Sequence, residues 1–215
     1  MYLPKAFDED RLPVLHEAIR AAGLATLVTV TAAGAEASHV PMLLDPTAGR
    51  FGTLYAHIAR ANAQWRDTLA GSGALAIFHG PDAYVSPSWY ATKAETGKVV
   101  PTWNYIVVHA YGQAEFFDDP QRLHALVARL TDRQEAPRPA PWAVTDAPAD
   151  YVAGQLRAIV GVALPIERLE GKWKLSQNRP AADQAGVVAG LGEATDERTL
   201  TLRDAMRARR PPAGS

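Results

Sequence analysis

The stretch ATLVTVTAAGAEASHVPMLLD, residues 25–45, decides the fold class. Its first part, Ala25–Thr31, is rich in β-branched side chains, which favour a strand. A turn is expected at Ala33-Gly34, followed by strands at His39–Leu44, which Asp45-Pro46 ends, and at Thr53–Ile58. Strands joined by such short connections predict an antiparallel meander.

The rest of the chain reads as further strands with helices around them. Strands are expected at Ala74–His79 and Ala83–Ser86, with a break at Gly80-Pro81 between them. A long strand is expected at Thr102–Phe117, with a bulge at Gly112. Two more strands, Ile159–Arg168 and Lys172–Leu175, are expected to form a hairpin around Glu170-Gly171. Helices are expected at Asp8–Ala22, Asn62–Ala70, after Asp119-Pro120, and at Tyr151–Ala158, Ala181–Gly190 and Thr199–Arg209. This pattern predicts one α+β domain over residues 1–209, built on a small barrel, and a disordered tail over 210–215.

Composition narrows the class of protein. The chain has 215 residues, 47% of them hydrophobic, a formal net charge of −1 and no cysteine. The lack of cysteine excludes disulfides, thiolate nucleophiles and thiolate metal sites, and the near-neutral charge does not support general DNA binding. With no signal peptide expected in residues 1–10 and no apolar stretch near the roughly 20 residues of a membrane span, we expect a cytoplasmic protein without membrane contact.

The segment from His57 to Asn62 is the first candidate site. A strand is expected to end near Ala59, Arg60 follows, and Asn62 is a candidate N-cap of a helix. Free N–H groups at a helix start bind anions, and the planar guanidinium of arginine matches a phosphate. The alternative is a surface arginine beside an ordinary cap.

Two aromatic segments form the second candidate. Residues 80–90 and 100–105 concentrate rings beside hydroxyls and one amide, namely Tyr84, Trp89, Tyr90, Trp103, Tyr105, Ser86 and Asn104. Stacking rings with a few directed polar groups suit a flat heteroaromatic ligand such as a flavin. A dimer interface or a core cluster is the alternative, because tyrosine and tryptophan are enriched there as well.

The histidines show no metal-binding pattern, since no pair has HExxH spacing and no acidic cluster accompanies them. A haem needs only one histidine, so that possibility stays open. No dedicated acid, base or nucleophile constellation identifies a catalytic residue. No helix–turn–helix pattern stands out, so direct DNA contact is possible but unsupported.

At these same segments the chain resembles the FMN-binding negative transcriptional regulators of the PaiB type. The resembling motifs are Met1–Lys5, His57–Trp65, Phe78–Tyr90, Val100–Tyr105 and Lys172–Arg179. The departure is Ala63, where proline is expected after the asparagine. The resemblance implies a mainly antiparallel split β-barrel of the pyridoxamine-phosphate-oxidase type with peripheral helices, working as a homodimer with FMN between two subunits.

The resemblance also implies a set of FMN-binding residues: His57, Ala59, Arg60, Asn62, Ser86, Trp89, Trp103, Asn104, Lys174, Gln177 and Asn178. By this resemblance, Arg60 and Asn62 correspond to the strand-end arginine and the start of the following helix, which bind the FMN phosphate. The polar residues that follow Lys174 can donate to the flavin carbonyls or to the ribityl hydroxyls, or they can cap the helix expected after Pro180.

Three functions remain in competition. The first is a negative regulator that senses a flavin or a metabolite, and the second is a flavin-dependent oxidoreductase that uses the same pocket. The third is a haem-binding or haem-degrading split-barrel protein. Flavin chemistry hardly needs a separate catalytic constellation, because the cofactor carries the reaction.

Overall fold

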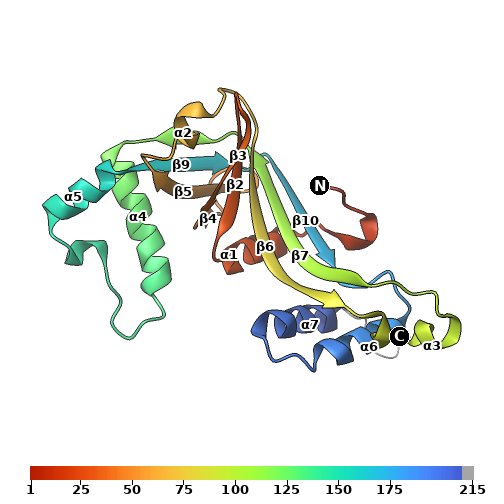
Figure 1. Cartoon of the computed structure of the whole chain (residues 1–215). Coiled ribbons are helices and arrows are strands. Elements are labelled where there is room, and N and C mark those ends of the chain that lie inside the picture. The colour runs from red at the N-terminus through yellow and green to blue at the C-terminus, as the bar shows by residue number, and fades with distance from the viewer. Residues whose placement is uncertain (210–215) are drawn as a thin grey trace. The chain divides into compact units, whose positions relative to one another are not determined.

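The computed structural model describes residues 1–209 (Figure 1), and the tail expected at 210–215 lies outside this range. The described chain divides into two compact units. The first contains residues 1–15, 79–108 and those from 170 onward, and the second contains residues 16–78 and 109–169. The chain passes between the units within β6 (Ala74–Val85) and β7 (Thr102–Gly112).

The second unit contains strands from two antiparallel sheets. In one, β2 (Ala25–Thr31) pairs along its whole length with β3 (Gly34–Val40), and also with the first part of β6. The other has the order β4-β5-β9-β8, formed by Leu43–Asp45, Thr53–Ala59, Ile159–Pro165 and Glu115–Phe117. The predicted meander is therefore wrong in two respects. Its second strand, His39–Leu44, is split between the end of β3 and β4, and its third strand, β5, belongs to a different sheet from β2 and β3.

The main helices of the second unit are α4 (Pro120–Glu135) and α5 (Ala149–Arg157), with the single turn α2 (Gln64–Asp67). Helix α4 buries one apolar face, because Leu123, Leu126 and Leu130 lie in one cluster with residues of β8 and β9. Asp119 caps α4 by accepting the Arg122 N–H at 2.8 Å. Helix α1 (Leu12–Ala21) runs from the first unit into the second, with Leu15 and Ile19 buried.

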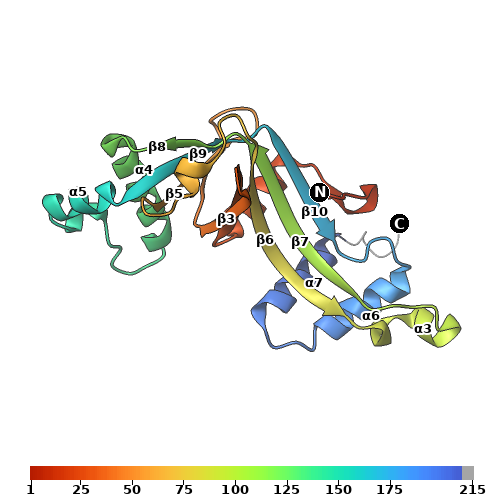
Figure 2. The same cartoon turned by 45° about the horizontal axis from the view of Figure 1, so that its top comes forward.

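The first unit is built on strands in the order β1-β10-β7-β6. Its new elements are β1 (Asp8–Glu9), β10 (Arg168–Lys174), α3 (Ala91–Thr96), α6 (Ala181–Leu191) and α7 (Glu197–Arg209), with 3-10 turns at Lys5–Phe7 and Pro87–Trp89. Helices α6 and α7 lie on the same side of the strands in both views (Figures 1 and 2). The Asn104 amide contacts the Met206 sulfur at 3.5 Å, which places α7 against the inner face of β7.

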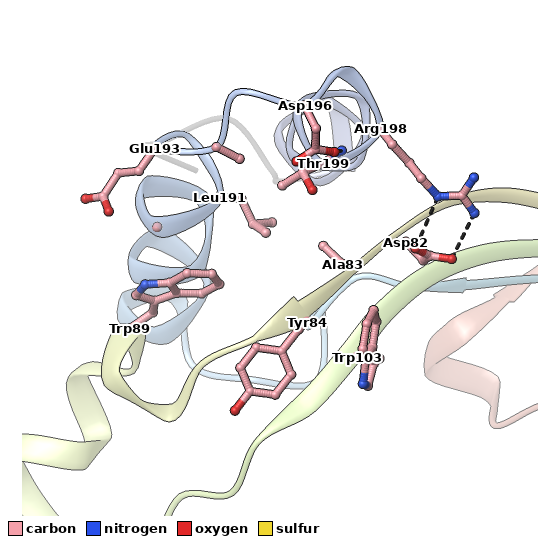
Figure 3. Close-up of a pocket in the computed structure, with 12 residues that line it drawn as sticks. Asp82, Ala83, Tyr84, Trp89, Trp103, Leu191, Glu193, Asp196, Arg198 and Thr199 are labelled. Atoms are coloured by element: carbon pink, nitrogen blue, oxygen red, sulfur yellow. Dashed lines mark hydrogen bonds and ion pairs between the residues drawn. The ribbon is translucent and has the colours of Figure 1, made fainter.

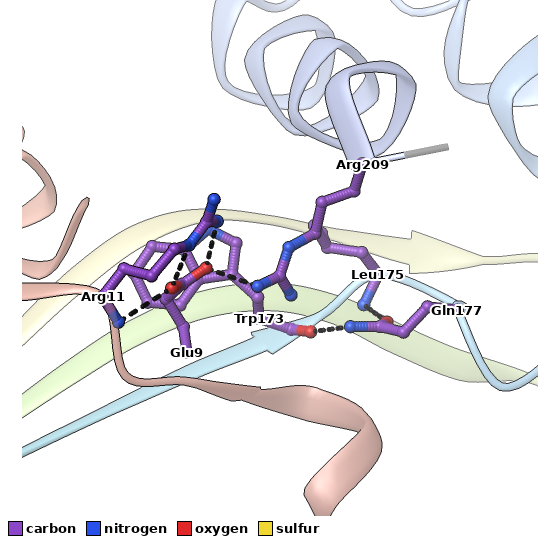
Figure 4. A network of polar contacts seen from close by, with 6 residues as sticks. All are labelled: Glu9, Arg11, Trp173, Leu175, Gln177 and Arg209. Carbon is purple, nitrogen blue, oxygen red and sulfur yellow. Dashed lines mark hydrogen bonds and ion pairs between the residues drawn. The ribbon is translucent and has the colours of Figure 1, made fainter. Parts of the chain in front are cut away.

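A buried carboxylate ties β1 to α7. Glu9 is 2% exposed, and both its oxygens accept from the Arg11 guanidinium, at 2.8 and 2.7 Å. The Arg209 guanidinium at the end of α7 donates to the same carboxylate (Figure 4). The two ends of the first unit are therefore joined by an ion pair between residues 200 positions apart.

Three further predictions about strands are wrong. Strand β6 continues through Gly80 and Pro81 instead of breaking there. Its pairing with β2 ends at Phe78, so the missing N–H of Pro81 costs no hydrogen bond to β2. Strand β7 ends at Gly112, where a Cβ would lie 2.1 Å from the Pro165 oxygen. Strands β9 and β10 are in different sheets and do not form the predicted hairpin.

Two predicted helices are shorter than expected. Helix α1 begins at Leu12, because Asp8 and Glu9 pair with Lys172 and Gly171 as strand β1. Helix α2 begins at Gln64 rather than at Asn62 and has only four residues. Within residues 1–209, no helix has the length and apolar character needed to cross a membrane.

Candidate functional site

One face of the first unit combines aromatic rings with cations. Successive side chains along a strand point to opposite faces of the sheet. The face opposite the one that carries the neighbouring buried residues has Tyr84 on β6, Trp103 and Tyr105 on β7, and Lys172 and Lys174 on β10. Contacts across the strands confirm the shared face: the Lys172 and Lys174 ammonium groups lie 5.4 and 6.0 Å from the centre of the Tyr105 ring. We call these five residues the aromatic–cationic face.

The rings of Tyr84 and Trp103 form an exposed pair. Their centroids are 6.1 Å apart and their planes meet at 73°, an edge-to-face arrangement. The two residues are 47% and 55% exposed, which is unusual for rings of this size. The pair therefore offers apolar area to a ligand or to another protein surface.

The cations on this face lack anionic partners. Lys174 donates to the Thr102 hydroxyl at 2.6 Å and to the Trp103 carbonyl, and Lys172 donates to the Tyr2 carbonyl at 3.0 Å. Among the described residues, neither lysine nor the nearby Arg179 forms an ion pair with a carboxylate. Burial lowers the pKa of Lys174, and the positive charges of Lys172 and Arg179 lower it further. A bound anion would relieve this repulsion.

A buried hydroxyl lies close to Arg179. Tyr90 is 3% exposed, and its hydroxyl makes no hydrogen bond of acceptable geometry within residues 1–209. The Arg179 guanidinium lies 5.0 Å from the centre of its ring. Burial raises the pKa of Tyr90, so that the hydroxyl keeps its proton and remains a potential donor.

A pocket of about 550 Å³ opens beside the aromatic pair (Figure 3). Trp89, Tyr84 and Trp103 contribute its rings, and residues of α6, α7 and the connection between them form the other side. The indole of Trp89 packs directly on α6, because a Cβ at Gly190 would lie 2.3 Å from that ring. The volume falls within the usual range of small-molecule sites.

The second unit holds the other candidate cation, Arg60, at the end of β5. Its Nε donates to the Arg157 carbonyl at 2.8 Å and its Nη2 to the Ile159 carbonyl at 3.2 Å, with Asp118 3.4 Å from Nη1. A guanidinium has five N–H groups, so donors remain for a ligand. Arg60 also lines a pocket of about 510 Å³ with residues of α4 and α5.

Asn62 and His57 have different surroundings in this unit. The Asn62 amide accepts from the Gln64 N–H at 2.9 Å and donates to the Ser38 hydroxyl at 2.8 Å. In the described chain, the buried Nδ1 of His57 has no hydrogen-bond partner, and burial lowers the pKa of this imidazole. His57 is therefore held in its neutral form with an available lone pair.

Comparison with known proteins identifies the family. The sequence model described as "Putative FMN-binding domain" matches residues 1–168. The chain is 30% identical to "Protease synthase and sporulation protein PAI 2" of Bacillus subtilis over 191 residues, which cover 89% of each protein. It belongs to the FMN-binding PaiB-type family. A protein of Aspergillus fumigatus is 36% identical over 236 residues, covering 89% of this PaiB-type chain and 90% of the relative.

Solved structures place the fold of this PaiB-type chain among the split barrels. The flavocytochrome Anf3 from Azotobacter vinelandii matches with a TM-score of 0.55 and 14% identity, over 78% of this chain and 69% of that one. The FAD and heme binding protein from Mycobacterium smegmatis matches with a TM-score of 0.54 and 17% identity, over 77% and 71%. The predicted α+β split barrel with peripheral helices is thereby confirmed.

The site residues predicted for the PaiB-type chain fall into two sets, one in each unit. His57, Ala59, Arg60 and Asn62 lie in the second unit, and Ser86, Trp89, Trp103, Asn104, Lys174, Gln177 and Asn178 lie in the first. Within the set that lies in the first unit, Trp89 and Trp103 line one pocket, and Lys174 bonds to the Trp103 carbonyl.

Several predicted polar residues already have partners in the first unit. The Asn104 amide, 1% exposed, bonds to the Ser176 hydroxyl at 2.9 Å, and Ser86 accepts the Ser88 N–H at 3.2 Å. The Gln177 amide accepts from the Leu175 N–H at 2.7 Å and donates to the Trp173 carbonyl at 2.5 Å, which closes its own turn (Figure 4). Asn178 is exposed.

Sequence reasoning missed Lys172 and Arg179 as individual site residues. The signal for Lys172 was present, because alternation along the expected strand places it on the same face as Lys174. Arg179 follows the strand, and its place beside Tyr90 depends on the turn that Gln177 closes. Such a turn leaves no periodic pattern in the sequence.

Proposed function

We propose that this protein binds FMN on the aromatic–cationic face of the first unit. The observation that carries the proposal is a group of cations without carboxylate partners beside an exposed pair of rings. A flavin mononucleotide has matching parts, a flat heteroaromatic ring and a phosphate. The match of residues 1–168 to an FMN-binding family supports the choice of ligand.

The residues of the face, together with the nearby Arg179 and Tyr90, suit distinct parts of FMN. Trp103 and Tyr84 provide apolar surface for the ring, whereas Lys174 and Arg179 provide positive charge for the phosphate or for the flavin carbonyls. The unpartnered Tyr90 hydroxyl adds a neutral donor. When bound, the flavin would supply the redox chemistry, and the protein would bind and orient it.

Arg60 with Asn62 is the competing anchor for the phosphate. This alternative rests on the family resemblance and on the N–H groups that Arg60 retains beyond its bonds to two carbonyls. The Asn62 side chain is engaged with Ser38 and Gln64, so Arg60 would make the main contact with the phosphate.

Fluorescence titration with FMN and riboflavin distinguishes the two anchors, because the ligands differ only in the phosphate. We expect Lys174→Ala to weaken FMN binding by about 1.5–3 kcal/mol and to leave riboflavin binding nearly unchanged. If Arg60→Ala alone abolishes the preference for FMN, the phosphate lies at Arg60. Equal FMN affinity in the wild type and both variants would refute both assignments.

We further propose a cytoplasmic homodimer that acts as a negative regulator responsive to a flavin or a metabolite. The exposed pair of Tyr84 and Trp103 favours a covering subunit, and the relative PAI 2 is named for protease synthesis and sporulation. Light scattering should give twice the monomer mass of 23.1 kDa. Turnover with a reduced nicotinamide and an electron acceptor would instead favour an oxidoreductase.

One observation favours haem as the second candidate. The neutral His57 imidazole has a buried Nδ1 without a partner in the part of the chain described here, and one such nitrogen can ligate haem iron. Mass spectrometry of the small molecule released by heat denaturation separates FMN from haem. A Soret band lost in His57→Ala would support the haem alternative.

A further inference from the structure

The pocket beside the aromatic pair is built largely from the C-terminal helices. Most of its lining residues lie between Gly190 and Thr199, on α6, α7 and their connection. These residues follow the FMN-binding domain matched at 1–168. The pocket is therefore a feature that this domain alone does not account for.

Three rings give the pocket its apolar character. Trp89 is fixed against α6, because Gly186 and Gly190 leave no room between the helix and this residue: a Cβ at Gly186 would lie 1.8 Å from the Trp89 oxygen. Trp103 and Tyr84 complete the aromatic part of the lining (Figure 3). The faces of such rings carry negative potential and attract cations.

The residues that line the pocket carry a net negative charge. Arg198 is neutralised by Asp82, since its Nε and Nη2 donate to the two carboxylate oxygens at 3.1 and 2.8 Å. This leaves Glu193 and Asp196 as the remaining charges. Asp196 accepts the Thr199 N–H at 2.8 Å, and this bond holds the pKa of its carboxyl below the usual range. Asp196 is therefore a carboxylate at neutral pH.

We infer that this pocket binds an organic cation, an amine or quaternary ammonium with an aromatic or apolar body. The rings provide cation–π and apolar contacts, and the exposed residues Glu193 and Asp196 at the edge of the pocket make its surroundings negative. A volume of about 550 Å³ accommodates a small molecule of this class. The same charges disfavour an anionic ligand.

Calorimetric titration with three probes of similar size tests the class of ligand: benzyltrimethylammonium, benzyl alcohol and benzoate. We expect measurable binding of the cation, weaker binding of the alcohol and none of the benzoate. The variant Glu193→Gln/Asp196→Asn removes both charges, while asparagine keeps the cap of α7. It should weaken binding of the cation about tenfold. Glu197→Gln, on the same turn of α7 but outside the pocket lining, is the matched control.

The inference is overturned if benzoate or benzyl alcohol binds as tightly as the cation, or if the double variant binds the cation like the wild type. The Tyr84 and Trp103 rings belong both to the pocket and to the aromatic–cationic face, so the two sites are distinguished by the carboxylates, neither of which is on that face. In FMN titration of the same double variant, unchanged FMN affinity with weakened cation binding supports a cation site that depends on these carboxylates. Equal weakening of both ligands would refute it.

Discussion

Replacing Glu9 by glutamine should destabilise the first unit. The carboxylate is 2% exposed and accepts from the Arg11 guanidinium twice, from the Arg11 N–H at 3.1 Å and from Arg209 (Figure 4). Glutamine has the same size, but it loses the charge and one acceptor and turns its NH₂ group toward arginine donors.

The expected cost of Glu9→Gln is about 2–3 kcal/mol. Removing one partner of a fully buried ion pair costs roughly 3–5 kcal/mol. The value is smaller here because the arginine side chains stay partly hydrated, with Arg11 64% and Arg209 25% exposed. For a protein of this size, the melting temperature should fall by roughly 4–12 °C.

The pH dependence gives the sharper test of Glu9. Hydrogen bonds from Arg11 lower the pKa of Glu9, and Arg209 adds to this effect, whereas burial opposes it. A carboxyl with a lowered pKa stabilises the fold above its unfolded pKa of about 4.3, and this contribution is lost as the pH falls through the folded value. The difference between wild type and variant should therefore shrink between pH 7 and pH 3.

Urea denaturation at both pH values measures the effect, with Asp8→Asn as the control. Asp8 is exposed on the same short strand, so its variant should stay within about 0.5 kcal/mol of the wild type. A cost for Glu9→Gln below about 0.5 kcal/mol at pH 7, or a cost that is the same at pH 3, would refute the reasoning.

Three more predictions follow from single contacts. Gly190→Ala should cost about 1–3 kcal/mol in thermal or urea denaturation, because the new Cβ would lie 2.3 Å from the Trp89 ring. Gln64→Ala should cost about 2–4 kcal/mol, since this fully buried amide bonds to the Ser38 hydroxyl at 2.6 Å and to three further partners. If the proposed FMN site is correct, FMN affinity should fall as the pH is raised above neutrality, because Lys174, whose pKa is lowered, loses its proton earlier than an ordinary lysine, and Lys174→Met should remove this slope.

Each of these three variants has a matched control. Gly154→Ala lies in α5, where the nearest atom to the new Cβ is the Arg157 guanidinium at 3.8 Å, so it should be neutral or stabilising. Gln155→Ala removes an exposed amide and should change stability little. Lys98→Met removes an exposed lysine outside the face and should keep the pH slope of the wild type. The reverse result in any pair would contradict the corresponding prediction.

The helices and strands that were predicted best from the sequence are those with a strong local pattern of residue types. Leu123, Leu126 and Leu130 have helical spacing, and they form the buried face of α4. Ala25–Thr31 has the composition of a strand, and it forms β2 without a shift at either end. These signals are local, so no knowledge of distant contacts was needed.

The predicted hairpin failed because Gly171 has a long-range role. Its sequence neighbourhood, Glu170-Gly171, has the composition of a turn. In the structure, a Cβ at Gly171 would lie 2.2 Å from Leu15 and 2.8 Å from the Glu9 oxygen. The glycine therefore permits close packing within a strand, and its partners are about 160 positions away, where no local pattern can show them.

The role of Gln64 was equally hidden from sequence reasoning. Gln64 lies two positions after Asn62 in the predicted helix, and nothing in that segment marks it as buried. In the structure, Gln64 is fully buried and bonds to Ser38, to Thr29 and to the Leu27 carbonyl on β2 and β3. A buried amide is recognised by its partners, and these come from another part of the sequence.

The order of segments in the two units has a consequence for synthesis on the ribosome. Strand β1 is made early, but its pairing partners on β10 are Gly171 and Lys172. At roughly 5–20 residues per second, β1 waits on the order of ten seconds for them to emerge. The second unit ends at residue 169, so its segments are all translated before the first unit can close. During this interval the nascent N-terminus lacks both β10 and the Arg209 partner of Glu9.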